Sequence, residues 1–189
     1  MRARTWLAGL LLMTLVPAAR AGLEPVLGDC GGEGGGSCLW QEPTVAAPRG
    51  WERKQGASAH YRAAAFAPAG SRFGNALAVM YAKAVPKEGQ PATLAAFIAQ
   101  DIAAFRRQYA GLEVKTGLSF ADGDGRRLSA VRMSPGKDGK AHWETIAYGE
   151  EGDHYLVFAL SAEGILEHEA ALPAFTQLVA SYHAGAGGR

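Results

Sequence analysis

The sequence predicts an α+β protein in which an antiparallel β-sheet is flanked by helices on both faces. Stretches with the two-residue alternation of strands give way twice to stretches with helical periodicity. Four strand-like stretches in the second half are joined by short turns, which favours antiparallel pairing. The last of them, "HYLVFALS" at 154–161, is apolar on both faces, so both faces of the sheet must be covered.

Two or three strands are predicted before the first helix. They lie at 59–66, at 75–85 and, as a weaker candidate, around 51–54. In the strand at 75–85 the side chains of Leu77, Val79 and Tyr81 share one face. The glycines at 70 and 74 predict the turn that joins the two clearer strands.

The first helix is predicted from an apolar stripe with spacing i, i+3, i+4, i+8, i+11 and i+15. Its members are Leu94, Phe97, Ile98, Ile102, Phe105 and Tyr109. Thr93 is the predicted N-cap, and Gly111 suits the C-terminal stop. We interpret the stripe as core packing rather than as the wall of a ligand groove.

An antiparallel meander of four strands follows. The strands are predicted at 112–120, 126–133, 141–149 and 154–161. Their connections, "ADGDG", "SPGKDGK" and "EEGD", contain the Asp-Gly and Pro-Gly pairs that are typical of turns.

A second helix closes the predicted domain. Its stripe is Leu172, Phe175, Leu178, Val179 and Tyr182. Because proline fits only the first turn of a helix, Pro173 predicts a regular helix from about Leu172, with 167–171 as a preceding turn or a kinked extension. The expected order is β-β(-β)-α-β-β-β-β-α.

The two ends of the chain predict export and a single folded domain. Residues 1–21 have a basic start, an apolar core of about ten residues and a small-x-small end, which together indicate a signal peptide cleaved after Ala21. Residues 22–42 are expected to be a flexible Gly-rich segment, 43–183 one domain and 184–189 a disordered tail. The predicted location is periplasmic or secreted, with no stable membrane span after cleavage.

The charge balance argues against a nucleic-acid partner. The chain has 19 Lys and Arg against 18 Asp and Glu, and the predicted signal removes three arginines and no acid. The mature chain would therefore carry 16 basic and 18 acidic residues, without the dense basic surface that nucleic acid requires.

The segment "CGGEGGGSC" contains the two cysteines of the protein, Cys30 and Cys38. In an exported chain such a pair predicts a disulfide, here closing a glycine-lined ring. A structural zinc site is less favoured because it needs four Cys or His ligands. A nucleotide loop is excluded because its lysine and its strand–helix frame are missing, and no cofactor is predicted.

Four segments resemble the PsbP-like family, which includes exported bacterial DcrB-like proteins. They are Gly50-Trp51, "TLAAFIAQDIAAF", "ETIAYGEEGDHYLVFAL" and "FTQLVASY". The resemblance covers roughly 45–183 and implies a sheet between helices with an accessory, assembly or chaperone-like binding role. It implies no shared reaction and carries over no functional residue. The Cys30–Cys38 segment lies outside it.

Three motifs invite a metal or catalytic interpretation. "HEAAL" at 168–172 begins like H-E-x-x-H but has leucine where the second histidine belongs, so a zinc protease is rejected. "DGDG" at 122–125 is interpreted as a turn, because two arginines follow it where a calcium loop would continue with acids.

The third is the set His142, Glu144 and His154. It could form a weak metal site or an acid–base pair, or consist of solvated residues at strand ends. The sequence therefore predicts a non-enzymatic accessory or binding domain whose partner is a protein of the cell envelope. The alternative is a weak metal-binding protein or metal-dependent enzyme that uses these three residues.

Overall fold

The computed structural model describes residues 22–29, 36–136 and 142–185. It confirms the predicted α+β class, and the described residues form a seven-stranded antiparallel sheet, a two-stranded sheet and three α-helices. The strands are β1 (Leu23–Asp29), β2 (Ser37–Pro43), β3 (Trp51–Arg53), β4 (Ala64–Pro68), β5 (Ala78–Pro86), β6 (Glu113–Ala121), β7 (Arg127–Ser134), β8 (Trp143–Glu151) and β9 (His154–Ala162). The helices are α1 (Gln55–Tyr61), α2 (Leu94–Gln108) and α3 (Ile165–Ala180), with a short 3₁₀ turn, η1 (Phe73–Asn75).

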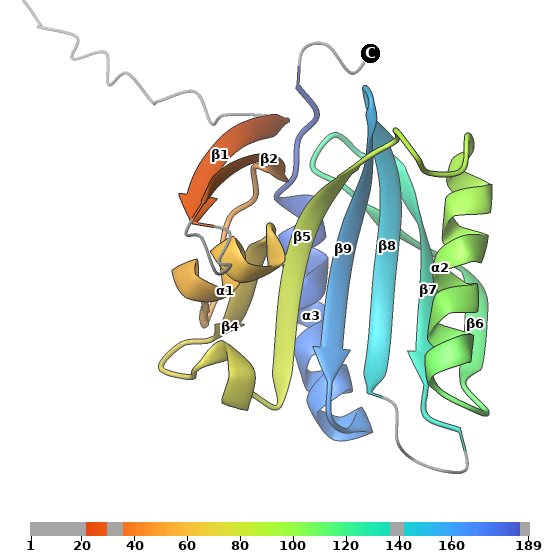
Figure 1. Ribbon diagram of the computed structural model, residues 1–189. Coiled ribbons are helices and arrows are strands. Elements are labelled where there is room, and N and C mark those ends of the chain that lie inside the picture. The colour runs from red at the N-terminus through yellow and green to blue at the C-terminus, as the bar shows by residue number, and fades with distance from the viewer. Residues whose placement is uncertain (1–21, 30–35, 137–141, 186–189) are drawn as a thin grey trace, which may run out of the picture.

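The large sheet has the strand order β3-β4-β5-β9-β8-β7-β6 (Figure 1). The predicted meander of β6 to β9 is confirmed, because each of these strands pairs with the next one along the chain. The last strand of the meander, β9, also pairs with β5 over its whole length. This pairing joins the strands before α2 and those after it into one sheet.

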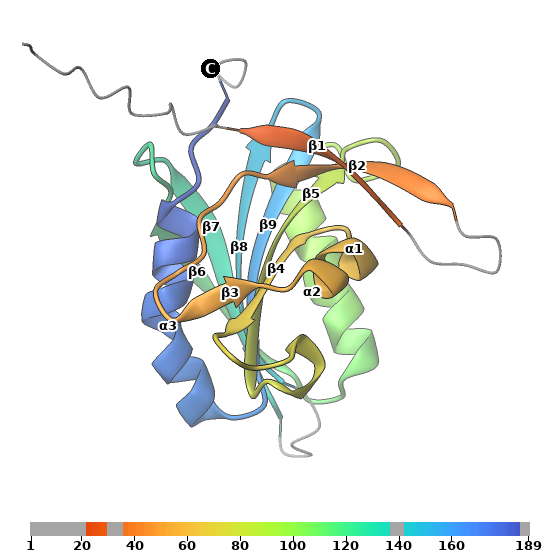
Figure 2. The same cartoon turned by 90° about the vertical axis from the view of Figure 1, so that its left-hand side faces the viewer.

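Two apolar clusters hold α3 and α2 against the sheet. Phe175 and Leu178 of α3 pack with Phe158 of β9, whereas Phe97 of α2 stacks on Tyr155 of β9 with ring centroids 4.4 Å apart. Figure 2 shows α3 on one side of the sheet and α2 on the other. Since successive strand residues point to opposite faces, β9 contributes to both clusters and is apolar from Tyr155 to Leu160.

The predicted first helix is confirmed with its cap. The hydroxyl of Thr93 accepts a hydrogen bond from the backbone N–H of Ala96 at 3.2 Å, and α2 begins at the next residue, Leu94. The bond satisfies one of the N–H groups that a helix start leaves without a partner.

The strand predicted at 59–66 is wrong in its first half. Residues up to Tyr61 belong to α1, and Arg62 ends the helix in a left-handed conformation with φ of 50°. The buried Ser58 then accepts a hydrogen bond from the N–H of Ala65, at 3.0 Å, which fastens α1 to the start of β4. Alanine favours helix, so this alanine-rich run carried no clear strand signal of its own.

The start predicted for the last helix is also wrong, because α3 begins at Ile165 and contains Pro173 in its interior. The buried positions of α3 include His168, Ala171 and Phe175, one continuous stripe that passes the exposed Pro173 on the inner side. Burial of this stripe outweighs the backbone hydrogen bond that proline removes.

The structure differs from the flexible segment expected at 22–42. β1 and β2 form an antiparallel hairpin, and β2 lies against β5. Glu42 of β2 is completely buried and forms an ion pair with Arg53. The glycine-rich composition obscured this, since the large apolar groups on the inner face of the hairpin are few.

The chain end also differs from the expected tail at 184–189. The N–H of Ala184 donates to Asp124 at 2.7 Å, and the N–H of Gly185 donates to Glu151 at 3.0 Å. The predicted signal peptide at 1–21 and residues 186–189 lie outside the described residues. Within the described part of the chain, no helix is both long and apolar enough to cross a membrane.

Candidate functional site

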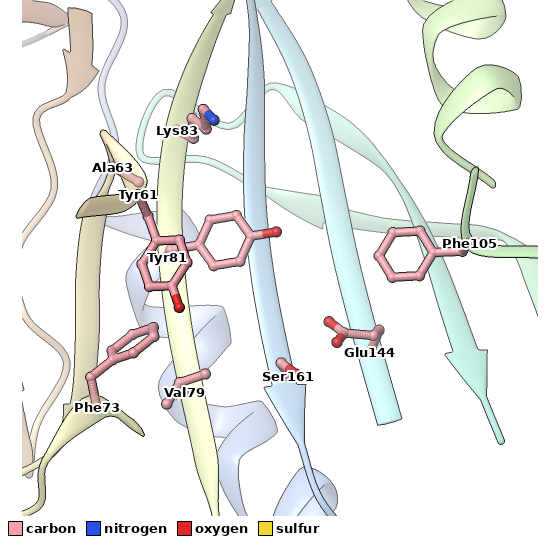
Figure 3. A pocket seen from close by; sticks show the side chains of 9 residues that line it. All are labelled: Tyr61, Ala63, Phe73, Val79, Tyr81, Lys83, Phe105, Glu144 and Ser161. Atoms are coloured by element: carbon pink, nitrogen blue, oxygen red, sulfur yellow. The ribbon is translucent and has the colours of Figure 1, made fainter. Parts of the chain in front are cut away.

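A groove of about 320 Å³ lies on the sheet face between α1, η1 and α2 (Figure 3). Its floor is formed by side chains of β5, β9 and β8, and its walls by aromatic rings from the flanking helices. The lining residues are Tyr61, Ala63, Phe73, Val79, Tyr81, Lys83, Phe105, Glu144 and Ser161. The volume is at the small end of the range for ligand sites, which suits a small molecule.

The strand register places the two charged groups of the groove at opposite ends. Val79 pairs with Ser161, which in turn pairs with Glu144, so these three form one row across β5, β9 and β8. Lys83 lies four residues further along β5. At the rise of a strand, this is a separation of about 13 Å along the groove, with Tyr81 between the two ends.

Glu144 carries a carboxyl group whose proton affinity is unusual. The pKa of Glu144 is raised to about 7, mainly because the carboxyl is buried. A hydrogen bond with the Ser161 hydroxyl lowers this pKa in part, and the nearby Asp101 carboxyl raises it. The alternation of β8 places Glu144 on the same face as Ile146 and Tyr148, beneath α2. This side chain therefore exchanges its proton near neutral pH.

Asp101 on α2 lies near enough to Glu144 to raise the pKa of that carboxyl. Its carboxylate accepts a hydrogen bond of 2.6 Å from the Tyr148 hydroxyl. Burial raises the pKa of Asp101, while this hydrogen bond lowers it. Burial also raises the pKa values of the Tyr148 and Tyr81 phenols, so both keep their protons over the physiological range.

Lys83 forms the cationic end of the groove. Burial lowers the pKa of Lys83, and the neighbouring Arg62 lowers it further. Among the described residues neither side chain has a carboxylate partner. Two cations thus lie close together without a counter-ion from the described part of the fold.

A second hollow, of about 310 Å³, lies on the α3 side between β3, β5 and α3. Trp51, Leu77 and Ala171 line it, and Glu167 is the one charged group among its described lining residues. It lacks the convergent polar groups that orient a ligand, so the groove is the better candidate site.

No family model and no curated protein matches the chain. The assignment of the groove as the candidate site therefore rests on its geometry.

The proposed metal set of His142, Glu144 and His154 is wrong, because the β8–β9 hairpin separates its members. His154 pairs with Glu151 at the turn, whereas Glu144 pairs with Ser161 seven residues further along the ladder. That spacing is about 23 Å. Nor do the described residues contain any group of three or more His, Cys, Asp or Glu side chains arranged for a metal ion.

Cys30 lies outside the described residues, so its pairing with Cys38 stays a prediction. Cys38 is in β2, opposite Gly28, and the next residue pair is Ser37 with Asp29. Cys30 directly follows Asp29 in the sequence. Cys30 is therefore the first residue of the segment that connects β1 to β2, and Cys38 is the second residue of β2.

The other two motifs have structural roles. His168 points from α3 into the core, where its Nε2 is hydrogen-bonded to the Thr145 hydroxyl at 2.9 Å. The Asp122 carboxylate of the "DGDG" segment accepts from the N–H groups of Asp124 and Arg126 and from the Arg126 guanidinium. It thereby organises the turn between β6 and β7, as the sequence predicted.

Sequence analysis missed most of the groove, although signals were present. Lys83 is in phase with the apolar face of Val79 and Tyr81, and Asp101 lies between Phe97 and Phe105 at a spacing of four residues. A charged residue in phase with an apolar stripe is partly buried by the elements on either side, and that indicates a site.

Proposed function

We propose that the protein is an exported, non-enzymatic binding module that holds a small ligand in the groove between α1, η1 and α2. The groove supports this directly: it combines an aromatic lining with a cation at one end and a protonatable carboxyl at the other. Such a surface, apolar with a few convergent polar groups, is typical of a ligand site.

Export and family are parts of the same proposal. The signal-like segment at 1–21 supports a periplasmic or secreted location. The layout of strands and helices, with α2 and α3 on the two sides of the sheet, supports a PsbP-like fold. An accessory role beside a protein of the cell envelope follows from that resemblance.

The separation of Lys83 and Glu144 argues against their acting together as a catalytic acid and base, and favours binding. A catalytic acid and base must both reach the reacting atoms. Lys83 and Glu144 are about 13 Å apart along the strands, at the two ends of the groove. They suit the two ends of one ligand better than one reacting bond.

A photo-crosslinking amino acid at Val79 tests the site in the cell envelope. After irradiation, intact-mass measurement of the exported protein should show an adduct of small-molecule size. A second substitution that fills the groove, Ser161→Phe, should abolish it. Ser129 on β7 is exposed and is the control position for the crosslinker. Equal adducts from Val79 and Ser129, or an adduct that survives Ser161→Phe, would contradict the proposal.

A further inference from the structure

The cationic end of the groove is built to receive an anion. Lys83 lines the groove, and Arg62 stands at the C-terminal end of α1 between Tyr61 and Ala63, which both line it; Arg62 also lowers the pKa of the lysine. An anionic group between them would relieve this repulsion and form charge-assisted hydrogen bonds. A carboxylate fits such a pair because it offers two acceptor oxygens.

Aromatic rings line the space between the two ends. Tyr61 and Phe73 stand at one wall, with ring centroids 5.5 Å apart, and Phe105 stands at the other (Figure 3). Tyr81 contributes the floor. Half of the Tyr61 side chain is exposed although it borders a groove. Rings arranged in this way favour a flat aromatic body over a flexible alkyl chain.

The far end requires a group that tolerates both states of the Glu144 carboxyl. The ionised carboxyl only accepts hydrogen bonds, whereas the protonated carboxyl also donates one. A hydroxyl both donates and accepts, so it fits either state. A second carboxylate would be repelled by ionised Glu144 and by Asp101, which lies near enough to raise the Glu144 pKa.

We propose that the groove binds a small hydroxylated aromatic carboxylate. Its carboxylate lies between Lys83 and Arg62, its rings lie on Tyr81, and its hydroxyl lies at Glu144 and Ser161. This inference rests on the proposed binding function and names the class of ligand for the same groove.

Calorimetric titration of the exported protein at neutral pH tests the class with three probes. They are a hydroxynaphthoate whose hydroxyl is on the ring remote from the carboxylate, unsubstituted naphthoate, and naphthylmethylammonium. The hydroxynaphthoate should bind at one site and more tightly than naphthoate. The ammonium compound should bind at least tenfold more weakly than either carboxylate, because it meets Lys83 and Arg62.

Two variants localise the carboxylate. Lys83→Met should weaken both carboxylates by about tenfold or more, the usual effect of losing a charge-assisted hydrogen bond. Lys115→Met removes the same charge from an exposed position on β6 and should leave both affinities unchanged. Arg62→Gly should also weaken both carboxylates while the fold is retained, since φ of 50° favours glycine.

The outcomes separate this inference from the proposed function. Equal binding of the ammonium compound, or equal effects of Lys83→Met and Lys115→Met, would overturn the ligand class. So would failure of both carboxylates to bind. If the Val79 crosslink persists in any of these cases, the groove remains the site and only the class of ligand is wrong. If that crosslink is also absent, both proposals fail.

Discussion

The hydroxyl of Tyr148 on β8 donates a 2.6 Å hydrogen bond to the carboxylate of Asp101 on α2. The bond fastens the middle of α2 to the sheet at Tyr148, which shares a row with Val157 and Lys83 across β8, β9 and β5. Phe105, which forms a wall of the groove, is one helical turn further along α2. The position of this wall therefore depends on a buried polar contact as well as on apolar packing.

Tyr148→Phe should lower the free energy of unfolding by about 1–3 kcal/mol, because it leaves the partly buried Asp101 carboxyl without its partner. Denaturant unfolding measures the change. Tyr109→Phe is the matched control, since the Tyr109 hydroxyl accepts a hydrogen bond from the exposed Gln108 amide, and its effect should stay within about 0.5 kcal/mol. Equal losses in the two variants would contradict the role assigned to Tyr148.

The pH dependence of stability should reveal Glu144. Its pKa is raised from an ordinary 4.5 to about 7, so its neutral form is favoured in the folded protein. The corresponding stability is fully present below pH 4.5 and is lost as the pH rises through about 7. The loss is on the order of 3 kcal/mol.

Glu144→Gln cannot ionise and should not show this loss. Urea unfolding at several pH values gives the free energy of unfolding of both proteins. Burial lowers the pKa of His168, so this residue changes stability with pH in the opposite sense. Its contribution is the same in both proteins and cancels in the difference between them. Asp101, Tyr148 and Tyr81 face position 144 in both proteins. Parallel stability curves for the two proteins would show that Glu144 has an ordinary pKa.

Thr145→Val should destabilise the protein by about 1–3 kcal/mol, because His168 would lose the hydrogen bond to its Nε2 in a fully buried position. Thermal or denaturant unfolding measures the effect. Thr176→Val on the exposed side of α3 makes the same substitution, and its change should be within about 0.5 kcal/mol. A larger loss from Thr176→Val would count against the buried pair.

The disulfide between Cys30 and Cys38 is tested by alkylation. Intact-mass measurement of exported protein should show no alkylated thiol before reduction and two after it. Ser37 and Asp29 are paired in the hairpin directly next to the two cysteines, which favours ring closure. Two alkylated thiols in the untreated protein would rule the bond out.

Much of the fold could be predicted because its signals are local. The stripe of α2, the Thr93 cap and the turns of the meander each depend on residues close together in the sequence. The β1–β2 hairpin and the early start of α3 could not be predicted in this way. Both depend on tertiary burial, of Glu42 against Arg53 in one case and of His168 on the inner face of α3 in the other.

The groove was hidden for a related reason. Lys83 and Glu144 are on different strands, and only the central position of β9 brings β5 and β8 within reach of one ligand. A linear pattern showed that Glu144 and His142 alternate, but it could not show that His154 lies at the other end of the hairpin. Strand order and register, which are long-range properties, decide which side chains share a site.

Amide chemical-shift mapping during titration with the hydroxynaphthoate shows where on the protein this ligand binds. We expect the assignment of the groove as the binding site to place the largest shifts on its floor, at Val79, Lys83 and Ser161. Shifts concentrated instead at the second hollow, around Trp51, Leu77 and Ala171, would contradict it, as would a spectrum unchanged at saturating probe.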